Sequence, residues 1–316
     1  MLWAVVLIMD IFLVMKEWKN KLNKNIYFFY VTGVILANAS LDIAFHDTIL
    51  MGNYSMLALL HTVSIIEKNE HIKKSDNEYI KMFWVGLMDG DGSIQVNHWR
   101  KQSLQFRLVI KLSNLASNYN MLIKIAKVIG GNIRVTGKGK DVIWVVNDKK
   151  IVQEIIKIFD IYPLLTSKKI CQLKFLKKCI EINSVDWYLS NRNNKYIDQS
   201  VIINTKSLVI ENNSFILPPY FKEWFSGFVE AEGCFCIRKN YNYSFSIGQN
   251  DDIYLINIIK QYLKASNLIR NPYRNFYLLE IYKKETIITI ISHFNNYPLL
   301  GEKAKSFQVF KQRFLQ

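Results

Sequence analysis

Two nine-residue stretches of this chain follow one pattern, and this repetition restricts the fold more than any other feature of the sequence. Residues 84–92 read WVGLMDGDG and residues 225–233 read FSGFVEAEG. In each, an apolar run is followed by two acids that flank a small residue, and a glycine comes last. Small residues also lie four positions apart, and they are Gly86, Gly90, Gly227 and Ala231. That spacing leaves one side of a helix bare, so we expect two buried helices whose backbones touch.

The second acid of each stretch, Asp91 or Glu232, comes just before the glycine that is expected to end the helix. In a pair of touching helices these two acids would lie side by side. Adjacent carboxylates resist being ionised together unless a cation lies between them, and oxygen ligands of this kind suit Mg²⁺. We therefore interpret Asp91 and Glu232 as a catalytic pair that binds Mg²⁺ or Mn²⁺. Asp89 and Glu230 lie about 200° further around the helix, so we interpret them as structural.

The same order of elements is expected after each motif. Hydrophobic periodicity predicts a motif helix, a strand pair, a helix, a second strand pair and another helix. A Tyr-Pro-Leu-Leu break and a basic helix then close each half. The repeat divides the chain into a leader (1–75), a first repeat (76–182), an Asn-rich linker (183–217) and a second repeat (218–316).

The charge of the chain is basic and unevenly distributed. The formal net charge is +15, from 41 Lys+Arg and 26 Asp+Glu. Residues 1–79 hold 7 of these basic and 8 of these acidic residues, so the positive excess belongs to the repeats. A folded region this basic indicates a polyanionic partner, most often nucleic acid. A coding bias towards Lys, Asn and Ile would also contribute to the excess.

The paired motifs and the repeat resemble those of the LAGLIDADG homing endonucleases, in the single-chain form with both motif copies. The resemblance covers about residues 79–316. It implies an α+β fold of tandem αββαββα repeats, with the motif helices at a pseudo-two-fold interface and two saddle-shaped antiparallel sheets over the DNA major groove. The implied activity is metal-assisted cleavage of both strands of a DNA target at the intronless exon junction, by a monomer, which promotes intron homing.

Two alternatives to this activity stay open. The first is an RNA maturase of the same fold, which binds the host intron RNA and assists its splicing, alone or as a second activity of an endonuclease. The second is a degenerate remnant that binds nucleic acid without cutting it. The presence of both motif acids favours the endonuclease.

The resemblance implies further active-site residues at matching positions. Lys168 and Lys303 occupy the same place after the two Pro-Leu-Leu breaks, where the family has a lysine beside the scissile phosphate. Both helices are rich in lysine, so an ordinary solvated position is the alternative. Asn114 and Gln249 lie near the end of the second strand of each repeat, where a polar residue of the family organises the attacking water.

DNA contacts are expected from strand residues that face away from the core. Arg can pair bidentately with guanine and Asn or Gln with adenine, while Lys mostly neutralises phosphates. For any one of these residues an ordinary solvated sheet face is an equal alternative. The candidate DNA-binding residues are Gln95, Asn97, Gln105, Arg107, Lys111, Arg238, Asn240, Asn242, Ser244 and Ser246.

The N-terminal segment differs in kind from the repeats. Residues 31–48, VTGVILANASLDIAFHDT, resemble a segment of cytochrome c oxidase subunit 1. The similarity ends after Thr48, so no oxidase-type metal site is expected. It implies an intron reading frame that is translated in phase from an upstream oxidase exon. We therefore expect a protein of the mitochondrial matrix, with a bacterium as the less favoured alternative, and an exon-derived leader at residues 1–75 that is open to removal.

Overall fold

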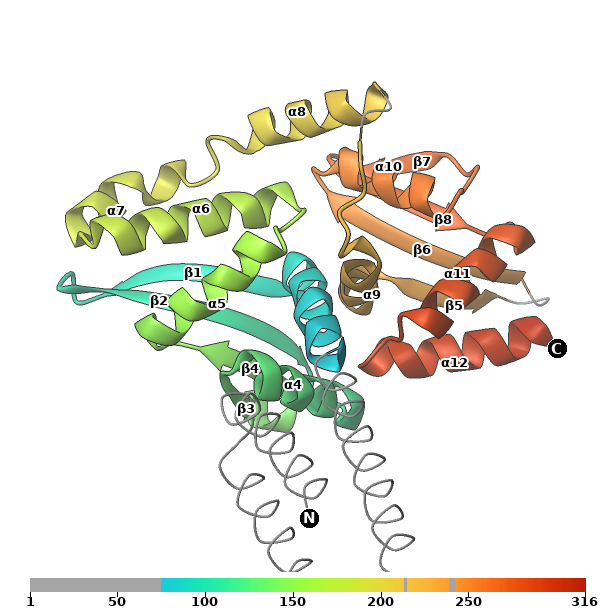
Figure 1. Cartoon of the computed structure of the whole chain (residues 1–316), viewed down its shortest axis with the longest axis horizontal. Coiled ribbons are helices and arrows are strands. Elements are labelled where there is room, and N and C mark those ends of the chain that lie inside the picture. The colour runs from blue at the N-terminus through green and yellow to red at the C-terminus, as the bar shows by residue number, and fades with distance from the viewer. Residues whose placement is uncertain (1–74, 213–214, 239–241) are drawn as a thin grey trace, which may run out of the picture. The chain divides into compact units, whose positions relative to one another are not determined.

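A computed structural model of the protein describes residues 75–212, 215–238 and 242–316 (Figure 1). The chain divides into two compact units, Met1–Ile72 and Lys73–Gln316, and every described residue belongs to the second. The stretch similar to the oxidase subunit and the DNA-binding candidate Asn240 lie outside the described residues. Within the described ranges, no helix is long and apolar enough to cross a membrane.

The first repeat has the predicted αββαββα order. Its motif helix, at residues 75–90, leads into an antiparallel sheet with the strand order β1-β2-β4-β3. The strands are β1 (Gly92–Trp99), β2 (Ser103–Ser113), β3 (Asn132–Thr136) and β4 (Asp141–Val146). The helices are α4 (Ala116–Ile129), α5 (Lys149–Ile161) and α6 (Ser167–Ile182).

The second repeat has the same order and the same topology. Its motif helix is α9 (Phe221–Glu232), and its antiparallel sheet has the strand order β5-β6-β8-β7. The strands are β5 (Cys234–Arg238), β6 (Asn242–Asn250), β7 (Ile269–Tyr273) and β8 (Phe276–Ile281). The helices are α10 (Ile253–Tyr262), α11 (Lys284–Asn296) and α12 (Glu302–Leu315). The two sheets and their helices confirm the α+β fold of two similar halves.

The segment between the repeats is more ordered than its Asn-rich composition indicates. It forms α7 (Val185–Asn191) and α8 (Gln199–Glu211), and α8 contacts both α6 of the first repeat and α10 of the second. The Lys206 ammonium donates a hydrogen bond to the Leu165 carbonyl (3.2 Å) and lies over the Tyr254 ring. The linker therefore helps to hold the two repeats together.

Each sheet has one apolar and one polar face, as expected for strands with a side-chain period of two. In β2, Phe106, Leu108 and Ile110 are buried, whereas Gln105 and Arg107 are exposed. This alternation confirms the predicted faces of the strand. The apolar face belongs to the core, so the polar face is available for a partner.

The two motif helices pack backbone against backbone at the centre of the fold (Figure 1). A Cβ atom added to Gly86 would lie 1.9 Å from the Trp224 carbonyl oxygen, and one added to Gly227 would lie 1.8 Å from the Phe83 carbonyl oxygen. A Cβ on Gly90 would lie 2.3 Å from that of Ala231. These distances are far below van der Waals contact. The small residues predicted from the sequence are therefore required by the helix pair.

Substitution of Gly86 by alanine is predicted to force the two motif helices apart. Alanine is favoured over glycine within a helix by about 1 kcal/mol, but overpacking of a rigid backbone contact costs about 3 kcal/mol or more. We expect Gly86→Ala to lower the free energy of unfolding, measured by urea denaturation. The matched control is Gly130→Ala, where the new Cβ meets no atom within 4 Å and only the φ of +90° opposes it. A Gly86→Ala protein as stable as Gly130→Ala would contradict the close packing.

Candidate active site

The second motif acids follow directly from the ends of the paired helices. The Asp91 amide donates to the Leu87 carbonyl (3.0 Å), and the Gly233 amide next to Glu232 donates to the Val229 carbonyl (2.9 Å). Gly233 has an extended backbone with a φ of −77°, so it is needed for space and not for a left-handed turn. A Cβ there would lie 2.5 Å from the Val229 side chain. In each repeat the chain thus passes from helix into strand within one residue of the acid.

Asp91 and Glu232 form an electrostatically coupled pair. Partial burial raises the pKa of both carboxyls, and the charge of Asp91 raises the pKa of Glu232 further. The ammonium groups of Lys169 and Lys303 act against this increase and lower both pKa values. Asp91 is open to solvent and Glu232 is half-buried, so the pair faces outward. Two acids brought together at the base of the helix pair are what the motif spacing predicts.

The structure places Lys303, but not Lys168, beside these acids. The Lys303 ammonium donates to the Gly233 carbonyl at 2.5 Å. In the first repeat the equivalent bond, to the Gly92 carbonyl, is made by Lys169. The Lys168 side chain is 52% exposed, and its ammonium lies 3.6 Å from Asp251. The prediction for Lys168 is therefore corrected to Lys169.

A charge difference between the halves accounts for this exchange of lysines. Lys168 is attracted to Asp251, whereas the equivalent residue of the first repeat is the uncharged Asn114. The second repeat also has no alternative to Lys303, because the next residue is Ala304. Distance along the chain from the proline break identifies the correct turn of the helix in both halves. In the first half, however, it selects Lys168 instead of Lys169.

The first motif acids are structural, as predicted, and they hold the helices that carry the active-site lysines. Asp89 is 1% exposed and accepts hydrogen bonds from the amides of Leu165 (2.7 Å) and Thr166 (3.0 Å), from the Thr166 hydroxyl (2.6 Å) and from the Trp224 indole (2.8 Å). Donors in this number offset the burial that raises its pKa.

Glu230 does the same for the second repeat. It accepts from the amides of Leu300 (3.2 Å), Gly301 (3.0 Å) and Lys303 (2.8 Å) at the start of α12. Asp89 and Glu230 therefore cap the N-termini of α6 and α12, where backbone amides point outward and favour negative charge.

The predicted water-organising residues differ between the halves. Asn114 donates to the Gly139 carbonyl (2.9 Å) and so fastens the turn between β3 and β4, away from the acids. Strand pairing makes Leu112, and not Asn114, the equivalent of Gln249. The prediction for Asn114 is therefore wrong. Gln249 is half-buried in β6, three residues past Ser246, which pairs with Cys234. Its role with water stays a prediction.

On the polar face of the first sheet, the predicted DNA-binding residues lie in cross-strand pairs. Asn97 faces Gln105, and Gln95 faces Arg107. Lys111 pairs with Asp141 at 2.9 Å. Two exposed residues of this face were not predicted, namely Trp99 at the end of β1 and Arg134 in β3. Arg134 pairs with Ile143 of β4, and Ile143 pairs with Lys111 of β2, so Arg134 lies on the same face of the sheet as Lys111. The alternation of side chains along β3 would have identified it.

On the second sheet, the Glu280 carboxylate forms ion pairs with both Arg238 and Arg270. Arg238 and Asn242 are exposed and Ser246 is half-buried, and their contacts with DNA stay a prediction. Ser244 is buried at 4% exposure, so it does not present the open contact surface that was predicted for it. Glu280 and Arg270 were not predicted, although the alternation of β8 and β7 places both on the polar face of this sheet.

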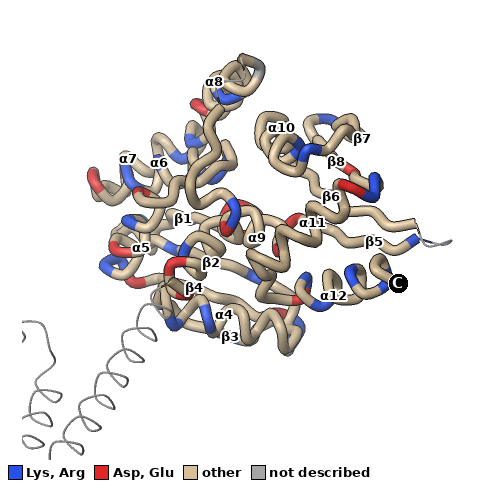
Figure 2. The backbone as a smooth tube through the Cα atoms, turned by 45° about the vertical axis from the view of Figure 1, so that its right-hand side comes forward, with Lys and Arg blue, Asp and Glu red and all other residues tan. Residues whose placement is uncertain are grey.

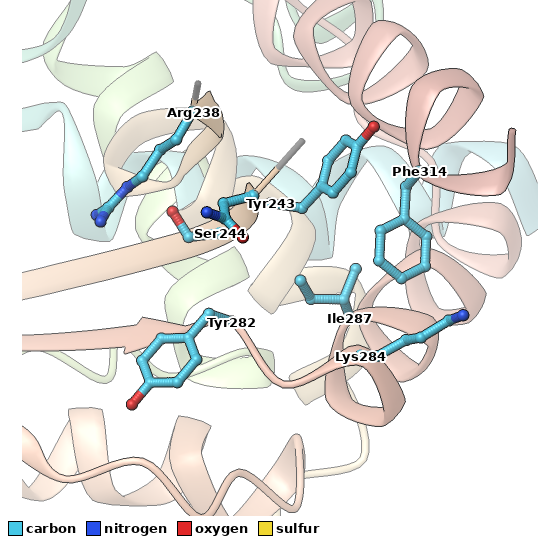
Figure 3. Close-up of a pocket in the computed structure, with 8 residues that line it drawn as sticks. Arg238, Tyr243, Ser244, Tyr282, Lys284, Ile287 and Phe314 are labelled. Carbon is cyan, nitrogen blue, oxygen red and sulfur yellow. The ribbon is translucent and has the colours of Figure 1, made fainter. Parts of the chain in front are cut away.

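A pocket of about 460 Å³ opens beside Ser244 (Figure 3). Arg238 at the end of β5 and Tyr282 just past β8 lie at its rim, and Lys284 and Phe314 lie on the far side (Figure 3). Tyr282 is 70% exposed. Along the edges of the two halves, α6 and α12 are rich in lysine and arginine (Figure 2). The polar faces and the two basic helices thus offer both hydrogen-bonding and positively charged groups.

Comparison with known proteins decides the family. The family profile described as LAGLIDADG endonuclease matches residues 84–179 and 225–314, one copy in each repeat. This chain belongs to the LAGLIDADG endonuclease family. Its two motifs place it among the members that carry both copies in one polypeptide.

The chain is similar to proteins from several organisms. The chain is 49% identical to the "Probable intron-encoded endonuclease aI3" of Dictyostelium citrinum, over 77% of this chain and 98% of that protein. It is 48% identical to the protein of that name from Debaryomyces hansenii, over 89% of this chain. The chain spans about half (48%) of the length of the Debaryomyces protein.

Solved structures share the fold. The LAGLIDADG meganuclease I-AabMI bound to uncleaved DNA is 24% identical, with a TM-score of 0.57 over 73% of this chain and 89% of that one. I-SmaMI bound to uncleaveable DNA is 19% identical, with a TM-score of 0.57 over 74% of this chain and 90% of that one. A further I-SmaMI structure is described as bound to uncleaved DNA in the presence of calcium ions.

The chemistry of Asp91 and Glu232 fits a divalent cation. Partial burial raises the pKa of both carboxyls, and the charge of Asp91 raises that of Glu232 further, so a cation between them would stabilise the ionised pair. In the part of the chain that the structure describes, no cluster of three or more His, Cys, Asp or Glu residues could replace them as ligands. The pair, with its two lysines, is therefore the candidate catalytic centre of this LAGLIDADG protein.

The exchange of lysines can be tested by comparing two neighbouring substitutions. Lys169→Met removes an ammonium beside the acids, so we expect DNA cleavage to slow by about 100-fold, as when one donor to developing charge is lost. Lys168→Met removes an exposed lysine that pairs with Asp251, and we expect less than about a threefold effect. Single-turnover cleavage rates measure both. A larger loss in Lys168→Met would restore the original prediction.

The coupling of the acids predicts a stability change without any DNA. Because both pKa values are raised in the folded protein, the ionised pair destabilises the fold progressively as the pH rises through them. Glu232→Gln should therefore raise the free energy of unfolding at pH 8 in EDTA by about 1 kcal/mol, after allowance for solvent screening. Addition of Mg²⁺ should stabilise the wild-type protein more than Glu232→Gln. Equal stabilisation of both would argue against a metal at this pair.

Proposed function

We propose that this protein is a site-specific endonuclease that cuts both strands of a DNA target at the intronless exon junction and so promotes the homing of its own intron. The observation that carries the proposal is the pairing of Asp91 and Glu232 at the base of the motif helices, between two lysines. The family membership supports it, as do the relatives named as intron-encoded endonucleases and the solved structures bound to DNA.

The chemistry divides among residues of the chain. Asp91 and Glu232 would hold Mg²⁺ or Mn²⁺, and the bound cation would make a water more acidic and offset charge on the phosphate. Lys169 and Lys303 stand beside the acids and offset the charge that develops at the scissile phosphates. Gln249 orients water in the second half, where the first half has Leu112. The two halves of the site are therefore chemically unequal.

The two polar sheet faces position the DNA. Half-buried Gln95 and exposed Asn97, Gln105 and Arg107 contact base edges in one half of the target, and Arg238, Arg270 and Asn242 do so in the other. Glu280 fixes the two arginines of the second sheet, which limits their rotation and favours a defined pairing with guanine. Lysines of α6 and α12 neutralise phosphates, so binding weakens as salt increases. A monomer with two unlike halves suits a target that is not palindromic.

The cellular setting is also part of the proposal. The stretch similar to cytochrome c oxidase subunit 1 supports translation from a mitochondrial oxidase gene and a site of action in the mitochondrial matrix. The relatives' names and the DNA-bound structures favour the endonuclease over the maturase.

The decisive experiment is cleavage of a DNA duplex that carries the ligated oxidase exons. We expect the wild-type protein with Mg²⁺ to cut this duplex, and EDTA to prevent cutting. Asp91→Asn and Glu232→Gln should each reduce the rate by at least about 100-fold while still binding the duplex. An inactive wild-type protein on this DNA would refute the proposal for this target. If the double acid variant restores splicing of the host intron, the protein also has the maturase activity.

A further inference from the structure

Each lysine-bearing helix is held at its N-terminus by the other half of the protein as well as by its own. The Ser167 amide, two residues before Lys169, donates to the carboxylate of Asp252 at 2.9 Å. The Glu302 amide, one residue before Lys303, donates to the side-chain carbonyl of Asn118 at 3.0 Å. Asp252 belongs to the second repeat and Asn118 to the first, so the two contacts cross the interface in opposite directions.

The crossed contacts are buried and firmly fixed. Asp252 is 1% exposed and Asn118 is 8% exposed. The Asn118 amide group donates to the carbonyl of Ser113, the last residue of β2 (3.0 Å). The Asp252 amide donates to the carbonyl of Asn250, the last residue of β6 (2.8 Å). Each contact therefore connects the end of a central strand in one sheet to a lysine helix of the other half.

A second pair of crossed contacts holds the chain just before each lysine helix. The Tyr79 hydroxyl of the first motif helix donates to the Pro298 carbonyl at 2.6 Å. The Tyr220 hydroxyl, just before α9, donates to the Pro163 carbonyl. Both proline breaks are thus fastened by the opposite repeat, at the end remote from the lysine. At the end where the lysine helix begins, the first break is held by Asp89 and Asp252. The second break is held at the same end by Glu230 and Asn118.

We propose that Asp252 and Asn118 are positioning residues, through which each half sets the position of the active-site lysine of the other half: Asp252 for Lys169, and Asn118 for Lys303. Neither residue bonds a lysine side chain directly, so both act through the first turn of the helix. Because a displacement of about 1 Å at a catalytic group costs up to about 100-fold in rate, loss of one contact slows the reaction that the distant lysine serves.

The proposal rests on the proposed endonuclease function, and strand-resolved cleavage tests it. The exon-junction duplex carries a different dye on each strand, and the first nick in each strand is timed under single-turnover conditions with the full-length protein. Lys169→Met and Lys303→Met are expected to slow opposite strands, which assigns one strand to each lysine. Asp252→Ala should then slow the strand of Lys169 by roughly tenfold, and Asn118→Ala the strand of Lys303.

The matched controls are Asp160→Ala and Asn296→Ala, which remove an exposed aspartate and an exposed asparagine that take part in neither contact. They should leave the ratio of the two nicking rates unchanged. Asp252→Asn keeps an oxygen that can accept from Ser167 and should restore most of the lost rate. A general loss of folding would slow both strands alike. Equal slowing, slowing of the strand assigned to the residue's own half, or failure of the lysine variants to separate the strands would overturn the proposal.

Amide hydrogen exchange gives a readout that needs neither DNA nor metal. Exchange at Ser167 should accelerate in Asp252→Ala while Glu302 stays protected, and Asn118→Ala should show the reverse. If the wild-type protein does not cut the duplex, the proposed function fails, yet exchange still tests the contacts. Unchanged protection of Ser167 and Glu302 in these two variants would overturn the crossed positioning by itself.

Discussion

The close approach of the two motif helices is the constraint on which the rest of the structure depends. At Gly86 and Gly227 the backbone of each helix occupies the space that a Cβ atom of the other would need. No side chain separates the helices there, so their relative position is set by covalent backbone geometry. That position brings the residues after the helices, Asp91 and Glu232, to one place. A packing requirement of the core thus determines where the two candidate catalytic carboxylates lie.

The four motif acids show how environment divides one chemical group between two tasks. Asp89 and Glu230 are buried, but each accepts at least three hydrogen bonds, most of them from backbone amides. These protein donors favour the charged form of each acid without a metal, in opposition to burial, which raises the pKa of both, and the two acids serve to cap helices. Asp91 and Glu232 are more open, and among the described residues no hydrogen bond from a protein donor satisfies them. What offsets their mutual repulsion is two lysines and, in the proposed function, a cation. Two residues of separation along a helix are enough to produce this difference.

The sequence predicts the repeated fold well because the same pattern occurs twice. Helix and strand order, the polar faces of β1 and β2, the close helix pair and the structural contacts of Asp89 and Glu230 follow from periodicity and spacing. The errors arise where the halves differ. Lys168 is drawn away by Asp251, a charge from the other repeat that alignment of one half alone does not reveal. The prediction for Asn114 is wrong for a related reason, because strand register, and not distance from the motif, decides which residue is equivalent to Gln249.

The same differences explain why one chain with two repeats need not behave as a symmetric dimer. The first half offers Asp91, Lys169 and Leu112 where the second offers Glu232, Lys303 and Gln249. The contacts across the interface are unequal as well, because a carboxylate, Asp252, supports α6 and a neutral amide, Asn118, supports α12. Two identical subunits would be forced to use one residue for both tasks. Fusion of the repeats removes that restriction, so each strand of a non-palindromic target can meet its own set of groups while the helix pair keeps the two acids together.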